Sequence, residues 1–166
     1  MISLKEKNRL KKMVMASVMA ALCCVATMVI HVPTPTGGYV NLGDTIVLFG
    51  AYILGPWWGG AAAGIGSGFA DLLSGYPIYV PATVIIKALM AIVAGVLYKS
   101  VHKKGFIIVS GIVAEIIMIV GYWLYDGFLM KNLVAAMAGI PGNLVQAVFG
   151  IVASAILVKC FKKVKM

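Results

Sequence analysis

The sequence predicts an all-α integral membrane protein in which six transmembrane helices form one domain. Hydrophobic residues make up 62% of the 166-residue chain and charged residues only 11%, whereas about half of an average soluble domain is apolar and about a quarter is charged. Four apolar stretches of roughly 18 residues or more are each long enough to cross a hydrocarbon core of about 30 Å, at 1.5 Å per residue. A fifth stretch, residues 45–73, can hold two shorter spans.

Prolines and glycines separate these spans. Two prolines and three glycines within residues 31–44 prevent a continuous helix there, so a long structured loop is expected. The fifth apolar stretch divides at Gly55 and Pro56, next to a tryptophan pair that suits a membrane interface. We therefore expect residues 1–166 to form a single membrane domain, with spans at about residues 11–30, 44–56, 57–74, 81–99, 105–126 and 141–161.

The distribution of Lys and Arg predicts the orientation of the chain. Five of these residues precede the first span, three lie between the fourth and fifth spans, and four follow the sixth, whereas the opposite connections contain only Lys131. Because positively charged connections stay in the cytoplasm, both termini are expected there, with residues 32–43, 74–80 and 126–140 facing outward. Most of the net charge of +9 therefore comes from Lys and Arg residues that flank the membrane spans and can contact membrane lipid. For this reason nucleic acid is not an expected partner.

The sequence lacks the common catalytic motifs. It contains no Walker loop, no His-Glu-x-x-His motif and no Ser-His-Asp set, so neither enzyme activity nor ATP hydrolysis by a P-loop is expected of this chain. Cys23, Cys24 and Cys160 lack metal-ligand spacing, and no metal or cofactor is expected. A membrane enzyme that uses Glu115 and Asp71 as acid and base is the least favoured function, because no nucleophile set accompanies them.

An acid and a base flank a short turn rich in Tyr and Pro. Asp71 lies near the end of the third predicted span, and Lys87 lies about 9 Å below the start of the fourth. Charged side chains inside a membrane are costly, so both residues are candidates for a function. One interpretation is a structural ion pair between Asp71 and Lys87 that fixes the two helices. The other is contact between Lys87 and a ligand.

One face of the fifth predicted span is polar. Spacings of three and four residues place Gly111, Glu115, Met118, Tyr122 and Asp126 on a single helix face that reaches from mid-membrane to the outer end. Glu115 and Tyr122 are therefore candidates for the wall of a binding pocket. The alternative for Glu115 is a hydrogen bond to a neighbouring helix that serves packing alone.

The sixth span and the outer loops add further candidates. Asn143 and Gln146 share a helix face, and their amides can both donate and accept hydrogen bonds, although Asn143 could instead cap the helix. The loop residues able to close over a ligand are Tyr39, Asn41, Asp44, Tyr76 and Tyr79. Tyrosine in such loops is also common as part of an interface belt.

Several short motifs occur in an order that points to a known family. They are the small-residue face Ala16-Ser-Val-Met-Ala20, then Asn41-Leu-Gly-Asp44, Leu54-Gly-Pro56-Trp-Trp-Gly59 and Ala70-Asp-Leu-Leu-Ser-Gly75, followed by Lys87. In this order, and over nearly its whole length, the chain resembles the substrate-binding S components of energy-coupling factor (ECF) vitamin transporters. It is most similar to the subgroup labelled riboflavin-type, which includes proteins assigned to hydroxymethylpyrimidine and pyridoxine.

The resemblance implies a protein of a prokaryotic plasma membrane that binds a vitamin from outside and associates with a transmembrane coupling (T) subunit and two cytoplasmic ATPase subunits. In that family the small residues of the first helix dock the coupling subunit, which corresponds here to Ala16 and Ala20. The other interpretation of this small-residue face is packing against a helix of the same chain. Family ligand contacts come from the outer loops and the outer halves of the last three helices. These correspond to Tyr79, Lys87, Glu115, Tyr122, Asn143 and Gln146.

The expected ligand is a small, water-soluble vitamin or precursor. A lining of acid, base, amide and tyrosine side chains favours a pyridine or pyrimidine such as pyridoxine or hydroxymethylpyrimidine. Riboflavin is the alternative substrate, and it would require a larger apolar slot. The alternative function is that of a self-sufficient small-molecule carrier that needs no ATPase partner.

Overall fold

The computed structural model describes residues 3–101 and 106–164, and most of these residues are helical. Two 3-10 segments, η1 (Pro77–Tyr79) and η2 (Met137–Gly139), lead into long helices. The helices are α1 (Leu4–Val29), α2 (Gly43–Leu54), α3 (Pro56–Leu73), α4 (Val80–Ser100), α5 (Phe106–Leu129), the single turn α6 (Leu133–Ala136) and α7 (Ile140–Val164).

Four segments of the described chain are long and apolar enough to cross a membrane. They are Glu6–Val29, Pro77–Ser100, Phe106–Leu129 and Leu133–Phe161. Helix α2 is apolar but has only 12 residues, about 18 Å of helix, which is shorter than a hydrocarbon core. The protein is therefore a multi-pass membrane protein with four helices that meet the length requirement on their own.

The chain reverses direction between α2 and α3 without an intervening loop. Gly55 separates the two helices with φ of 86°, a backbone conformation in which a Cβ atom would be strained. Pro56 occupies the first turn of α3, where its missing N–H group costs no helical hydrogen bond. The Gly-Pro pair thus ends one helix and begins the next.

A small β-hairpin departs from the predicted all-α fold. Strand β1 (His31–Pro33) pairs antiparallel with β2 (Tyr39–Asn41), so that Val32 lies opposite Val40. The connecting turn is closed by the Thr34 N–H group, which donates to the Gly38 carbonyl at 2.9 Å. The segment expected to be a structured loop is therefore a hairpin, and it positions β2 directly before α2.

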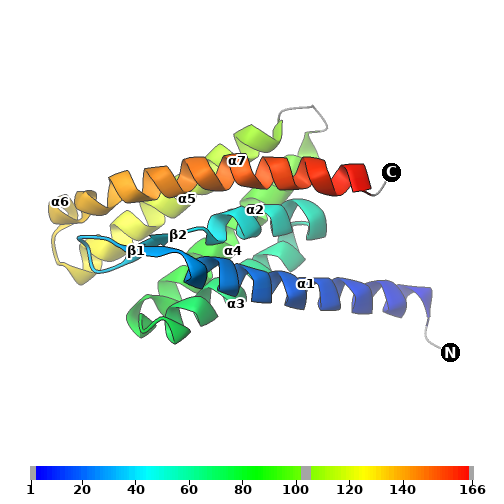
Figure 1. Cartoon of the computed structure of the whole chain (residues 1–166), viewed down its shortest axis with the longest axis horizontal. Helices are drawn as coiled ribbons and strands as arrows, with labels where there is room; N and C mark the ends of the chain where they lie inside the picture. The colour runs from blue at the N-terminus through cyan, green and yellow to red at the C-terminus, as the bar shows by residue number, and fades with distance from the viewer. Residues whose placement is uncertain (1–2, 102–105, 165–166) are drawn as a thin grey trace.

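The helices form an elongated bundle in which the connections gather at its two ends (Figure 1). The N-terminus, the C-terminus and the junction between α2 and α3 lie at one end. The hairpin, the connection between α3 and α4, and α6 lie at the other end. Helix α2 is enclosed by α1, α3, α4 and α7, and all but two of its 12 residues are buried.

Glycines allow α3 and α4 to lie unusually close to each other. A Cβ atom added at Gly64 would lie 2.9 Å from the Val84 carbonyl oxygen, and one added at Gly68 would lie 2.6 Å from the Val84 side chain. Real Cβ contacts are not that short, so larger residues at these positions would push the helices apart. This close packing fixes the ends of α3 and α4, which contribute to the site described below.

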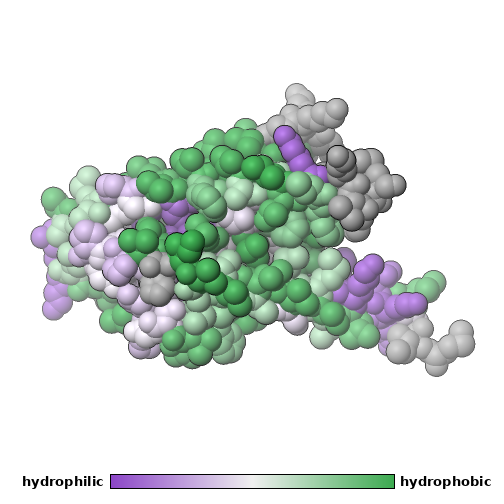
Figure 2. Space-filling model, in the orientation of Figure 1, coloured by the Kyte–Doolittle hydropathy of each residue, from purple (hydrophilic) through white to green (hydrophobic). Residues whose placement is uncertain are grey.

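The outer surface of the bundle is mostly apolar (Figure 2). Hydrophobic residues cover its middle, and strongly hydrophilic residues gather where α1 begins. More hydrophilic residues appear at the hairpin end. An exposed apolar surface of this extent is unfavourable in water and is suited to contact with the lipid of a membrane.

Candidate functional site

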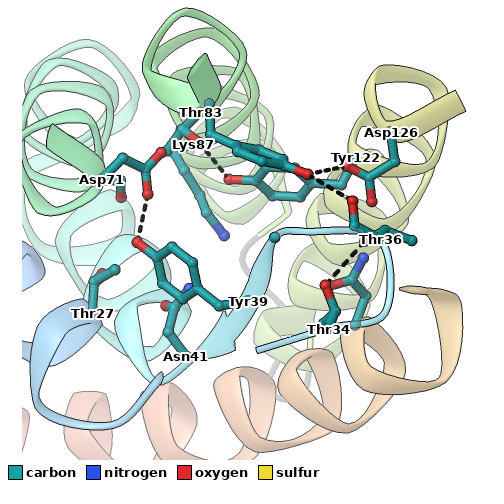
Figure 3. A pocket seen from close by; sticks show the side chains of 14 residues that line it. Thr27, Thr34, Thr36, Tyr39, Asn41, Asp71, Thr83, Lys87, Tyr122 and Asp126 are labelled. Atoms are coloured by element: carbon teal, nitrogen blue, oxygen red, sulfur yellow. Dashed lines mark hydrogen bonds between the residues drawn. The ribbon is translucent and has the colours of Figure 1, made fainter. Parts of the chain in front are cut away.

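A polar pocket lies at the hairpin end of the bundle. Side chains from α1, the hairpin, α3, η1, α4, α5 and α7 converge on it (Figure 3). The lining is rich in hydroxyl groups and contains two acids, one base and two amides. The lining residues are Thr27, Thr34, Thr36, Gly38, Tyr39, Asn41, Ser67, Asp71, Tyr79, Thr83, Lys87, Tyr122, Asp126 and Asn143.

Lys87 forms an ion pair with Asp44, not with Asp71. The two side chains are 2% and 1% exposed, and the Lys87 ammonium donates a hydrogen bond to Asp44 Oδ1. The expected pair between Asp71 and Lys87 is therefore wrong. Lys87 lies two turns into α4, whereas Asp71 lies only two residues before the end of α3, so the two residues are at different depths. Asp44, in the first turn of the enclosed helix α2, lies at the depth of Lys87.

A hydrogen-bonded chain connects this ion pair to the hairpin. Gln146 of α7 donates through Nε2 to Asp44 Oδ2 at 2.5 Å, and its Oε1 accepts from the Asn41 N–H group at 2.6 Å. The Asn41 side chain in turn accepts from the Gly43 N–H group at 2.8 Å. Because one glutamine bridges α7, β2 and α2, the position of the hairpin depends on the same buried acid that neutralises Lys87.

Asp71 instead accepts a hydrogen bond from the hairpin. The Tyr39 hydroxyl donates to Asp71 Oδ1 at 2.5 Å. Burial, with this hydrogen bond and the nearby carboxylate adding to it, raises the pKa of Tyr39 well above its usual range, so the hydroxyl remains a donor at neutral pH. The other oxygen of Asp71, Oδ2, is buried and has no hydrogen-bond partner among the described residues.

A second acid lies across the pocket on α5. Asp126 accepts a hydrogen bond of 2.9 Å from the Tyr79 hydroxyl. Tyrosine rings continue from there along the rim: the Tyr79 centroid lies 6.4 Å from that of Tyr76, which lies 4.7 Å from that of Tyr39. Tyr76 is therefore part of the rim, although it does not line the pocket itself. This rim provides aromatic faces on which a flat ring could stack.

The floor of the pocket contains Tyr122 and Thr83. Their hydroxyl groups lie 3.0 Å apart, and the Lys87 ammonium lies 5.4 Å from the Tyr122 ring centroid. This is within the range of a cation–π contact. Lys87 is thus held by one carboxylate and one aromatic face.

Glu115 lies deeper in the bundle than the pocket lining. It is 2% exposed, and neither carboxylate oxygen has a hydrogen-bond partner among the described residues. A Cβ atom at Gly150 would lie 2.8 Å from Glu115 Oε1 and 3.0 Å from the Asp44 Cβ, so both acids approach the backbone of α7. Glu115 is therefore a buried neighbour of Asp44, two helical turns below Tyr122.

The comparison with known protein families identifies the family of this chain. Residues 7–163 match the family described as the ECF-type riboflavin transporter, S component. The chain belongs to this family. An uncharacterized protein in the gap 3′ region of Pyrococcus woesei is 33% identical over 129 residues, which cover 77% of this chain and 86% of that protein. A solved S component of a bacterial ECF transporter has the same fold, with a TM-score of 0.76 and 20% sequence identity over 95% of this chain and 99% of that one.

This S component has a second hollow, between α1 and α3. It is apolar and is lined mainly by small side chains, among them Ala16, Ser17, Ala20 and Ala21 of α1 and Ala62 and Gly66 of α3. Larger apolar residues, Trp58, Ile65 and Phe69, complete its wall. We call it the α1–α3 groove. The predicted small-residue face of the first helix therefore borders an open groove.

The structure brings most of the predicted site residues together in two layers. Asn41, Tyr79, Lys87, Tyr122 and Asn143 line the pocket, and Asp71 lines it as well. Asp44, Gln146 and Glu115 form the layer beneath, and all three are at most 5% exposed. The face predicted for the fifth helix points inward, since Glu115, Met118 and Asp126 are all buried.

Sequence reasoning missed the hydroxyl groups of the pocket. Thr27, Ser67 and Thr83 belong to apolar helices, and a single hydroxyl on a helix gives no signal of its own. Thr83 could have been found, because it lies four residues before Lys87 and therefore on the same helix face. Thr34 and Thr36 belong to the hairpin turn, which was expected only as a structured loop.

Among the described residues, no group of His, Cys, Asp and Glu side chains is arranged to hold a metal ion. The lining of the pocket offers hydrogen bonding, charge and aromatic faces. That combination is suited to binding a small polar molecule.

Proposed function

We propose that this S component binds and helps to import a small pyridine or pyrimidine vitamin or precursor, related to pyridoxine or hydroxymethylpyrimidine. The observation that supports this best is the polar pocket under a tyrosine rim. Its amides, acids and hydroxyls can match the several donors and acceptors of such a ring, while the rim supplies aromatic faces. Riboflavin, named in the description of the matching family, is the alternative substrate.

The contacts we assign to the ligand come from both layers of the site. Lys87, Tyr79, Tyr122, Asn41 and Asn143 would touch it directly. Asp44, Gln146 and Glu115 would act mainly by holding the direct contacts in place, and Tyr76 would close the rim. Asp71, first expected to be structural, is proposed as a ligand contact as well, because it lines the pocket and its Oδ2 has no hydrogen-bond partner among the described residues.

We further propose six membrane spans with both termini in the cytoplasm. Both termini lie at one end of the bundle, together with most of the basic residues (Figure 1), which is the pattern expected of a cytoplasmic face. Helices α2 and α3 would complete the six, with α2 shielded from lipid by its neighbours. The pocket and its hairpin would then face the outside.

The α1–α3 groove is the surface we assign to the partner subunit. Ala16 and Ala20 are the small residues at which a helix of the transmembrane coupling subunit would dock, because small side chains let two helices approach closely. That subunit, together with two cytoplasmic ATPases, would supply the energy for import. This chain itself would not hydrolyse ATP.

Uptake of labelled vitamins by vesicles tests this function. Vesicles that contain this chain, its coupling subunit and the two ATPases should accumulate labelled pyridoxine or hydroxymethylpyrimidine when ATP is present inside. Vesicles that contain this chain alone should not. Equal uptake by the chain alone, undiminished by Ala16→Leu and Ala20→Leu, would instead establish a self-sufficient carrier.

A further inference from the structure

Almost all the acidic residues of the chain are buried around the pocket. The sequence has only five Asp and Glu residues, and four of them, Asp44, Asp71, Glu115 and Asp126, are at most 4% exposed. The fifth, Glu6, is exposed at the start of α1, where it forms a capping box with Ser3. In a protein with a net charge of +9, such a concentration of acid in the interior is unexpected from composition alone.

Lys87, the buried base among them, is already neutralised. Lys87 is paired with Asp44 and lies over the Tyr122 ring. Gln146 donates to the remaining oxygen of Asp44, so this carboxylate is fully engaged. The pair therefore contributes little net charge to the pocket, and the charges that remain in the lining are those of Asp71 and Asp126.

Asp71 has one carboxylate oxygen for which the described part of the protein supplies no dedicated donor. Its Oδ2 is buried without a partner among the described residues, while Oδ1 is held by Tyr39. The Thr83 hydroxyl lies beside Asp71 and can donate its one proton either to that carboxylate or to the Tyr122 hydroxyl, 3.0 Å away. A buried polar atom without a hydrogen bond is destabilising, and an unpaired carboxylate oxygen is more so.

The two lining acids face each other across the pocket. Figure 3 shows that Asp71 and Asp126 approach it from opposite sides, with tyrosine rings between them. Asp71 belongs to α3 and Asp126 to α5. A cationic ligand would therefore have a carboxylate on either side, although the carboxylate of Asp126 already accepts a hydrogen bond from Tyr79.

We infer that the pocket selects ligands that present a positively charged or N–H-bearing nitrogen to Asp71, and that it discriminates against ligands with an anionic group at that position. This inference rests on the proposed function and makes it more specific. The Asp71 carboxylate supplies the free acceptor, and Asp126 adds negative charge to the same lining. An anionic substituent there would meet like charge in surroundings where water cannot screen it.

The inference can be tested with compounds that share one ring and a similar size but carry a positive, a neutral or a negative substituent. Pyridoxamine, pyridoxine and 4-pyridoxic acid differ at one substituent, which is an aminomethyl, a hydroxymethyl or a carboxylate group. The 5-aminomethyl, 5-hydroxymethyl and 5-carboxylate forms of 4-amino-2-methylpyrimidine form a parallel series. Affinities for the purified full-length protein in detergent would be measured by isothermal titration calorimetry.

In the series that binds, the amine should bind most tightly and the carboxylate at least a hundredfold more weakly. Asp71→Asn preserves the acceptor for the Tyr39 hydroxyl but removes the charge. It should reduce the ratio of amine affinity to carboxylate affinity at least tenfold. Glu6→Gln, which removes the one acid outside the cluster, should leave the ratio unchanged. The order of affinities in the unmodified protein decides the question even if Asp71→Asn does not fold.

The outcomes separate this inference from the proposed function. Equal or tighter binding of the carboxylate compound would overturn the inference but leave the function in place. Binding restricted to riboflavin would overturn both the inference and the proposed pyridine or pyrimidine substrate. Failure of every compound to bind, together with absent uptake in the complete vesicle system, would overturn the proposed function as well.

Discussion

The pocket and the α1–α3 groove share helices α1 and α3 but have opposite chemistry. Thr27 of α1 and Asp71 of α3 line the pocket at the hairpin end. Ala16 of α1 and Ala62 of α3 line the groove. The pocket gathers hydroxyl and acidic groups that form specific hydrogen bonds, whereas the groove presents small apolar side chains without directional contacts. One helix pair can therefore serve ligand recognition and partner docking separately, and substitutions should affect one without the other.

Substitution of Lys87 should have the largest effect on the pocket. Lys87→Met leaves Asp44 buried without its counter-charge, and breaking a buried ion pair typically costs about 3 to 5 kcal/mol. We expect a strongly lowered thermal unfolding temperature in detergent and loss of ligand binding. Adding Asp44→Asn to this variant should recover part of the stability. Lys12→Met, which removes an exposed lysine of α1, is the matched control, and a Lys87→Met protein as stable as this control would contradict the assignment.

Substitutions in the groove should abolish assembly with the coupling subunit and leave ligand binding unchanged. Ala16→Leu combined with Ala20→Leu fills the space between close-packed helices, so co-purification with the coupling subunit should be lost. Ligand affinity should stay within about twofold of the original. Val18→Leu, on an exposed position of the same helix, should leave assembly intact. If the double variant lost ligand binding and still assembled, the division between the two regions would be wrong.

Removal of the Tyr39 hydroxyl should lower the affinity for the ligand by a moderate factor. Tyr39→Phe leaves Asp71 without its donor, and a hydrogen bond to a charged group is worth about 1.5 to 3 kcal/mol. We expect about a tenfold or greater loss of affinity in calorimetry and little change in assembly. Because burial raises the pKa of Tyr39, its hydroxyl stays protonated at neutral pH. The ratio of ligand affinities between the original protein and Tyr39→Phe should therefore be the same at pH 6 and pH 8. A difference that disappeared at pH 8 would argue against this hydrogen bond.

Glu115→Gln should give the smallest effect of the four. The residue lies beneath the pocket lining and forms no hydrogen bond among the described residues, so it acts on the ligand only through Asp44 and Lys87. We expect the affinity to fall by a few-fold while the unfolding temperature is maintained. Unchanged affinity would assign Glu115 to packing alone.

The parts of the site that follow helical periodicity could be predicted from the sequence. The inward face with Glu115 and Tyr122, and the pair Asn143 and Gln146, were found because residues three or four positions apart on a helix share a face. The ion-pair partner of Lys87 could not be predicted in this way, because Asp44 comes close to Lys87 only when α2 is enclosed by the other helices. The hairpin was missed because its strands have three residues each, too few for an alternating pattern to be recognised.

Mass spectrometry of the ligand released from the protein purified out of cells tests the central claim most directly. The S component should release one small pyridine or pyrimidine compound bearing a nitrogen donor, in close to equimolar amount. The Lys87→Met variant, purified in parallel, should release none. Release of riboflavin, or of the same compound in equal amount from both proteins, would contradict the proposed ligand and the role of Lys87 in binding it.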